Sequence, residues 1–231
     1  MKNGTRLQRL HAGLEAIPQK RQRTNLLGSL SQYGKHAAAA ESVLRANADA
    51  ERLSRQVFPD LATAPAAESR RRASRLAGRL AKRLRERIDA VQDRATDEDF
   101  ASLAEHVRSA DKALRDRWSR QLEDRLKGYG ALVKAAEAAK LSGSRVLATQ
   151  LTMLQGHAGA PPRTPELAEQ IRKALDGLTG MVAQLGLEGA PGRFLMDAAA
   201  GRGDARALRD PEVQAFVERH DLWRLLVVTF R

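Results

Sequence analysis

Two consecutive segments carry the most regular pattern of hydrophobic and polar residues in the chain. In the first segment, apolar residues recur every three or four positions, at Ala73, Leu76, Leu80, Leu84, Ile88 and Val91. In the second segment they recur at Phe100, Leu103, Val107, Ala110, Leu114, Trp118, Leu122 and Leu126. This spacing places each set along one face of an α-helix. We therefore expect an antiparallel helical hairpin that spans roughly residues 68–127.

The connection between these two helices is expected at residues 96–99. Thr96 is a favourable N-cap residue, and Asp99 three positions later completes a capping-box pattern. Facing residues of an antiparallel pair have a nearly constant index sum, and the match of Leu80 with Leu114 gives 194. That sum centres the turn near residue 97. Capping chemistry and hydrophobic register therefore predict the same turn.

The part of the chain before the hairpin is also expected to be helical. A short helix should end at Pro18, since proline disrupts the interior of a helix. A longer helix is predicted from about Thr24 to Phe58, where Pro59 follows. Residues 60–67 (DLATAPAA) then form a linker to the hairpin.

After the hairpin, glycine and proline divide the chain into short helices. Breaks are expected at Gly128-Tyr129-Gly130 and Ser142-Gly143-Ser144. Helices should begin after Thr164 and Asp210, because each is an N-cap residue followed by a proline. We expect the segments between these breaks and helix starts to be mainly helical.

Residues 156–163 (GHAGAPPR) are the predicted domain boundary. They divide a helical and hairpin domain, residues 1–155, from a small C-terminal module, residues 164–231. The end of that module, residues 222–230 (LWRLLVVTF), is compatible with a last buried helix or with a strand added to a partner's sheet. The expected fold class is all-α: an elongated helical protein with a central antiparallel helical hairpin and a small helical C-terminal module.

Composition narrows the class of protein. Hydrophobic residues make up 42% of the 231 residues, but aromatic residues only 4%, so close packing of helices must supply the stability. The absence of cysteine excludes disulfides and thiolate metal sites. No apolar run approaches the roughly 20 residues that span a bilayer, and the first residues lack an apolar leader. We therefore expect a cytoplasmic protein without membrane association.

The net charge of +12 is concentrated in the first part of the chain. Residues 1–95 contain 20 Lys and Arg against 9 Asp and Glu, whereas residues 96–231 contain 20 against 19. Between Arg70 and Arg87, nine basic residues stand against one acid, Glu86. Such a basic region indicates a polyanionic partner, and nucleic acid is favoured over a membrane surface.

Within this region, a basic stripe lies opposite the leucine face of the predicted helix. A row of guanidinium groups suits phosphate oxygens, because each group can donate two parallel hydrogen bonds. The residues predicted to contact nucleic acid are Arg71, Arg72, Arg75, Arg79, Lys82 and Arg83. An acidic protein partner and a merely solvated face are the alternatives. The predicted register gives some support to a solvated face, because acids of the second helix would neutralise part of the positive charge. It pairs Arg83 with Asp111, Arg70 with Asp124 and Arg71 with Glu123.

Other chemistry finds little support in the sequence. The five histidines lack metal-ligand spacing, and nucleophile-elbow and phosphate-loop motifs are absent. We therefore expect no catalytic residue, metal, cofactor or small-molecule substrate. A second expected surface, for other protein subunits, comprises Trp223, Leu225, Val227 and Phe230.

The leading hypothesis is a non-enzymatic accessory or scaffold subunit of a bacterial-type, multi-protein nucleic-acid-handling assembly. Such a subunit would contact the phosphate backbone without strong sequence specificity. The alternative is a helical adaptor or oligomerisation protein that binds only protein partners. An enzyme whose site is assembled from scattered residues is the third hypothesis.

Overall fold

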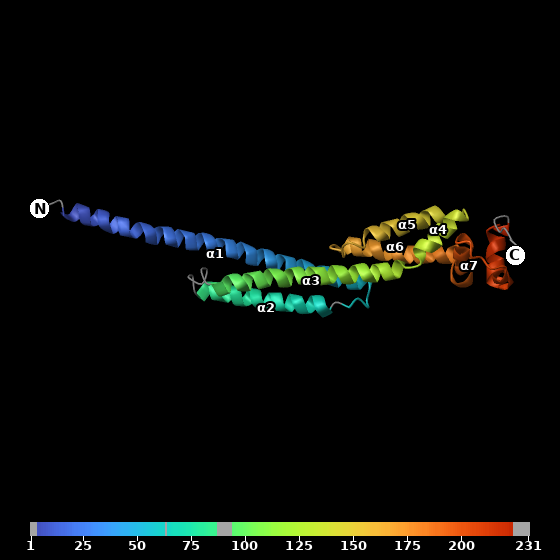
Figure 1. Cartoon of the computed structure of the whole chain (residues 1–231), viewed down its shortest axis with the longest axis horizontal. Helices are drawn as coiled ribbons and strands as arrows, with labels where there is room; N and C mark the ends of the chain where they lie inside the picture. Colours follow the sequence, from blue (N-terminus) through green and yellow to red (C-terminus); the bar gives the residue numbers. More distant parts are fainter. Residues whose placement is uncertain (1–3, 63, 87–93, 224–231) are drawn as a thin grey trace. The chain divides into compact units, whose positions relative to one another are not determined.

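The computed structural model describes residues 4–62, 64–86 and 94–223. Every regular element in these ranges is a helix, so the expected all-α class is confirmed (Figure 1). The helices are α1 (Gly4–Val57), α2 (Ala64–Glu86), α3 (Arg94–Leu126), α4 (Tyr129–Ala138), α5 (Ser144–Gly156), α6 (Pro165–Gln184), α7 (Gly189–Ala199), the 3-10 helix η2 (Ala205–Arg209) and α8 (Pro211–Arg219).

Helix α1 is longer than expected. It runs without interruption through Pro18, so the predicted end at this residue is wrong. A proline inside a helix removes one backbone donor and costs about 3 kcal/mol. The residues that follow it, Gln19 to Arg23, are strong helix formers, and they keep the surrounding backbone helical. The predicted end near Phe58 is confirmed, because α1 ends at Val57.

Helices α2 and α3 form the expected antiparallel pair and lie side by side in Figure 1. The start of α3 differs from the prediction. This helix begins at Arg94, so Thr96 lies inside it and is not the N-cap. Asp97 then occupies the first turn, where a carboxylate interacts favourably with the positive end of the helix dipole. The acid at position 97 is therefore explained by its favourable place in the first turn of α3, without a capping box.

The register of the pair also differs from the prediction. The side chains of Arg83 and Asp99 meet across it, with an index sum of 182. Leu80 and Leu103 belong to one buried cluster, with an index sum of 183. The predicted sum of 194 is thus wrong by eleven or twelve residues, or about three helical turns. Apolar stripes that repeat every turn face each other equally well after such a shift, so periodicity alone does not choose between the two registers.

The described contacts divide the chain into two compact units. The first comprises residues 1–49 and 62–114, and the second comprises residues 50–61 and 115–231. The predicted boundary at residues 156–163 lies inside the second unit. The core of the first unit is a small cluster contributed by three helices: Leu44 from α1, Ala73, Leu76 and Leu80 from α2, and Leu103 from α3.

The core of the second unit is larger and surrounds Trp118. This side chain is fully buried, packs against Phe58 with ring centroids 5.2 Å apart, and donates from Nε1 to the carbonyl oxygen of His157 at 2.8 Å. Helices α4 to α8 supply most of the remaining core, including Leu147, Ile171 and further buried residues. A buried indole N–H needs such an acceptor, which ties the loop after α5 to α3.

The predicted helix boundaries in this unit are confirmed. Gly128 and Gly143 have φ values of 93° and 90°, which places the expected breaks before α4 and α5. The Thr164 hydroxyl accepts from the backbone N–H of Leu167 at 3.3 Å, and the Asp210 carboxylate caps α8 in the same way. Local chemistry therefore sets these ends, as the sequence indicates.

Residues 224–231 lie outside the described ranges. The choice between helix and strand for residues 222–230 therefore stays a prediction, as do the roles of Leu225, Val227 and Phe230. Over the described ranges, no helix has the length and apolar content required to cross a membrane.

Candidate nucleic-acid interface

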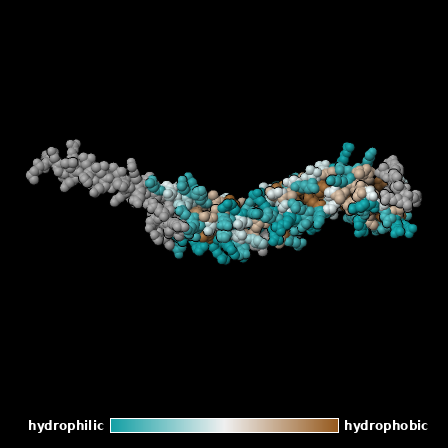
Figure 2. Space-filling view, in the orientation of Figure 1, coloured by the Kyte–Doolittle hydropathy of each residue, from teal (hydrophilic) through white to brown (hydrophobic). Residues whose placement is uncertain are grey.

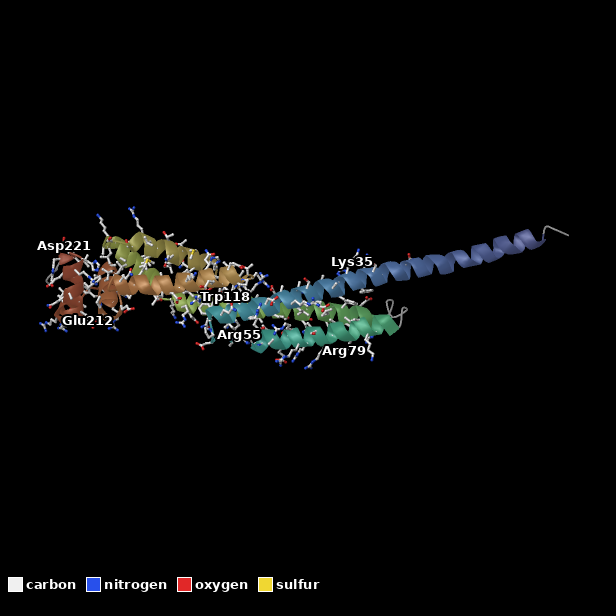
Figure 3. All side chains as sticks on the ribbon, turned by 180° about the vertical axis from the view of Figure 1, so that it is seen from behind. Lys35, Arg55, Arg79, Trp118, Glu212 and Asp221 are labelled. Carbon is white, nitrogen blue, oxygen red and sulfur yellow. The ribbon has the colours of Figure 1, made fainter. Side chains whose placement is uncertain are left out.

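Helix α2 separates apolar from basic side chains on opposite faces. Ala73 and Leu80 are fully buried and Leu76 is nearly so, and all three pack against residues of α1 and α3. The opposite face is exposed and carries Arg71, Arg72, Arg75, Arg79 and Lys82. Figure 3 shows Arg79 extending from α2 into solvent. Five of the six residues predicted for nucleic-acid contact therefore reach solvent from one helix.

The sixth residue, Arg83, is half-buried and forms an ion pair. Its Nη1 atom lies 2.9 Å from Oδ2 of Asp99 on α3. The expected pairing of Arg83 with Asp111 depended on the predicted register and is replaced by this contact. The Asp99 carboxylate offsets most of the positive charge of Arg83, and the ion pair joins α2 to α3. We therefore assign it to the hairpin and not to the exposed basic face.

The remaining arginines of this face differ in their surroundings. Arg72 forms an ion pair with Glu68, one turn earlier on the same helix. Arg71, Arg75 and Arg79 have no hydrogen-bond or ion-pair partner among the residues that the structure describes. We call these three residues the arginine ridge. They are the part of the predicted site whose charge is left to solvent or to a partner.

The spacing of the arginine ridge is unfavourable for the isolated helix. Its members stand four residues apart, about 6 Å along the axis. Like charges at this spacing repel each other, and each such pair destabilises a helix by about 0.2–0.5 kcal/mol. Elsewhere the chain places an acid at this position, as in the pairs of Glu41 with Arg45 and Glu51 with Arg55. The ridge therefore concentrates positive charge that a polyanion would neutralise.

Two acids near the start of α3, Asp97 and Asp99, have partners on the neighbouring helices. The Tyr33 hydroxyl donates to the Asp97 carboxylate, and the Tyr33 ring stacks on Phe100 with centroids 4.6 Å apart. This hydrogen bond, together with burial and the nearby negative charge, raises the pKa of Tyr33 above its usual value of 10.0. Asp97 and Asp99 thus both have partners inside the first unit, the first on α1 and the second on α2.

The space-filling view agrees with this description. Figure 2 shows hydrophilic residues over most of the visible surface of α2 and α3. In α2 itself, the exposed residues are mainly arginine, lysine and serine. The sequence pattern predicted this exposed stripe correctly, but it did not separate the paired Arg72 and Arg83 from the ridge. That distinction depends on which acids lie within reach in the folded chain.

The second predicted surface is described only at its start. Leu222 is buried, whereas 47% of the Trp223 surface is exposed. Among the described residues, the other large hydrophobic side chains with comparable exposure are Val43 and Val146. An exposed indole is typical of a residue that anchors a protein–protein contact. Trp223 therefore remains a candidate for a partner site.

The second unit contains a hollow with charged side chains in its lining. The hollow, of about 350 Å³, is lined by Glu188, Glu212 and Arg219, together with apolar residues. The sequence pattern did not single out these three residues, because they come from different segments. All three residues are exposed to solvent. Over the described ranges, no group of three or more His, Asp or Glu side chains is arranged to hold a metal ion.

Comparisons with protein-family models, with curated proteins and with solved structures found no significant match to this chain.

Proposed function

We propose that this protein is a non-enzymatic accessory subunit of a multi-protein assembly that handles nucleic acid. In this role, α2 would contact the phosphate backbone through Arg71, Arg75 and Arg79, with Lys82 at the end of the row. The observation that carries the proposal is the arginine ridge: three exposed guanidinium groups in line, with no described partner. Because guanidinium groups bind phosphate oxygens in a forked geometry, this row suits a chain of phosphates.

The expected binding is electrostatic and weakly dependent on base sequence. Contacts to phosphate position a protein on nucleic acid but do not read the bases. The apolar face of α2 is already packed in the first unit, so only the basic face is available. With three to four phosphate contacts on duplex DNA, the log–log slope of affinity against salt is about −2.7 to −3.6. Raising salt from about 50 to about 200 mM should then weaken binding by about 40- to 150-fold.

The test compares a ridge variant with a charge-matched control. In the ridge variant, Arg71, Arg75 and Arg79 are replaced by Glu, which lowers the formal net charge from +12 to +6. In the control, the exposed residues Lys134, Arg145 and Arg193 of the second unit are replaced by Glu, with the same change in net charge. Binding to a fluorescent duplex of mixed sequence is measured by anisotropy over a salt series.

Loss of binding in the ridge variant but not in the control supports the proposal. The salt slope should also become shallower by about 0.9 for each phosphate contact removed. The proposal is wrong if the unmodified protein fails to bind at about 50 mM salt, or if both variants weaken binding equally. In the second case, net charge and not the ridge would explain the affinity. Circular dichroism of both variants confirms that they are folded.

We propose further that other subunits dock near Trp223. The supporting observation is its large exposure beside the buried Leu222. The matched comparison is Trp223→Ala with Val146→Ala, since Val146 is also exposed but lies on α5. Loss of a co-purifying subunit in the first variant alone supports this assignment. A protein that retains such subunits but binds no nucleic acid would instead be the adaptor that the sequence offers as an alternative.

A further inference from the structure

We infer that the nucleic acid contacted by α2 is double-stranded, and that single strands bind more weakly. This inference rests on the proposed function, because it specifies the class of polyanion that meets the arginine ridge. Two features of the first unit carry it: the packing that holds the ridge at a fixed spacing, and the lack of an unstacked aromatic ring in the described part of this unit.

The ridge is held at fixed spacing. Its helix is anchored from behind by Ala73, Leu76 and Leu80, which are buried in the cluster shared with α1 and α3. From Arg71 to Lys82 the row extends about 16 Å along the axis at 1.5 Å per residue. A row of positive charges at fixed spacing is complementary to a stiff duplex, whose phosphates are also regularly spaced. Duplex DNA offers one charge per about 1.7 Å of its axis, about twice the density of a single strand.

Proteins that bind single strands usually stack bases on aromatic side chains. Helix α2 contains no aromatic residue. Within the described part of the first unit, the aromatic rings are those of Tyr33 and Phe100, and they stack on each other. Each ring therefore already has a face covered by its neighbour. The ridge offers charge to a nucleic acid but no platform for its bases.

The experiment compares three probes of about 25 nucleotides or base pairs at about 50 mM salt. The probes are a mixed-sequence DNA duplex, an RNA duplex and oligo-dT, which does not pair with itself. If duplex DNA and a single strand bind equally at about 1 M salt, the difference in salt slope for four phosphate contacts, about 0.8, predicts about tenfold tighter binding of the DNA duplex at about 50 mM. The charge reversals at Arg71, Arg75 and Arg79 should abolish this preference, whereas the Lys134, Arg145 and Arg193 control should retain it.

The outcomes separate this inference from the proposed function. Equal or tighter binding of oligo-dT overturns the duplex assignment but leaves phosphate binding intact. Absence of binding to all probes overturns both. A preference for either duplex over oligo-dT supports the inference, and the DNA and RNA duplexes then show which double helix is bound more tightly.

Discussion

Replacement of Gly192 by alanine should disrupt the first turn of α7. A Cβ atom at this position would lie 2.1 Å from the carbonyl oxygen of Leu187 and 3.2 Å from Cδ1 of Leu132. Leu187 is itself buried, and its N–H donates to the carbonyl oxygen of Val182 at 2.9 Å, so its backbone has little room to retreat. Glycine inside a helix is otherwise unfavourable, which indicates that close backbone approach explains its presence here.

The magnitude follows from the size of the overlap. Close carbon–oxygen contacts in proteins are about 3.3 Å, so α7 would have to move by more than 1 Å. Overpacking of this kind destabilises a protein by about 1–3 kcal/mol. Alanine also stabilises a helix by about 0.5–1 kcal/mol relative to glycine, which offsets part of the loss. An overlap of more than 1 Å with backbone belongs at the upper end of this range, so we expect a net loss of about 2 kcal/mol in the free energy of unfolding, or about 4–8 °C in Tm for a chain of this size.

The control is Gly180→Ala on α6, where no neighbouring atom lies within 4 Å of the added Cβ. This variant should raise the stability by about 0.5–1 kcal/mol, because only the helix propensity changes. Thermal unfolding is followed by far-ultraviolet circular dichroism and by the fluorescence of the buried Trp118, in a Trp223→Phe background that removes the exposed indole. If Gly192→Ala melts at or above the temperature of the unmodified protein, the assigned contact with Leu187 is wrong.

Two further predictions concern local contacts. The phenol of Tyr33 should titrate above its usual value of 10.0, and Asp97→Asn should lower its pKa, because the carboxylate that accepts the hydrogen bond is lost. A raised folded-state pKa contributes stability that is present below the unfolded pKa and is lost as pH rises through the folded value. Tyrosinate absorbance in a Tyr129→Phe background measures this titration, and an unchanged pKa in Asp97→Asn contradicts it. Thr164→Ala should lower the free energy of unfolding by about 1 kcal/mol by removing the cap of α6, whereas Thr164→Ser should retain it, as checked by urea denaturation. Equal stability of these two variants would show that the hydroxyl does not cap the helix.

The predictions that proved correct depend on interactions between residues close in sequence. The caps at Thr164 and Asp210 and the breaks at Gly128 and Gly143 involve neighbours within a few positions. The same is true of the exposed stripe of α2, since helical periodicity alone decides which residues share a face. The predicted helix end at Pro18 is wrong, because the strong helix formers that follow this proline keep the backbone helical.

The amino-acid sequence by itself determined that this protein is helical, where most helices begin and end, and which face of α2 is basic. These properties follow from propensity, capping and periodicity, which act over one or two helical turns. Only the tertiary structure decided the register of α2 against α3, because a regular apolar stripe fits its partner again after about three turns. That register places Asp99 beside Arg83 and leaves Arg71, Arg75 and Arg79 without a described partner. The candidate interface is therefore a product of packing between distant segments, although every residue in it is visible in the sequence.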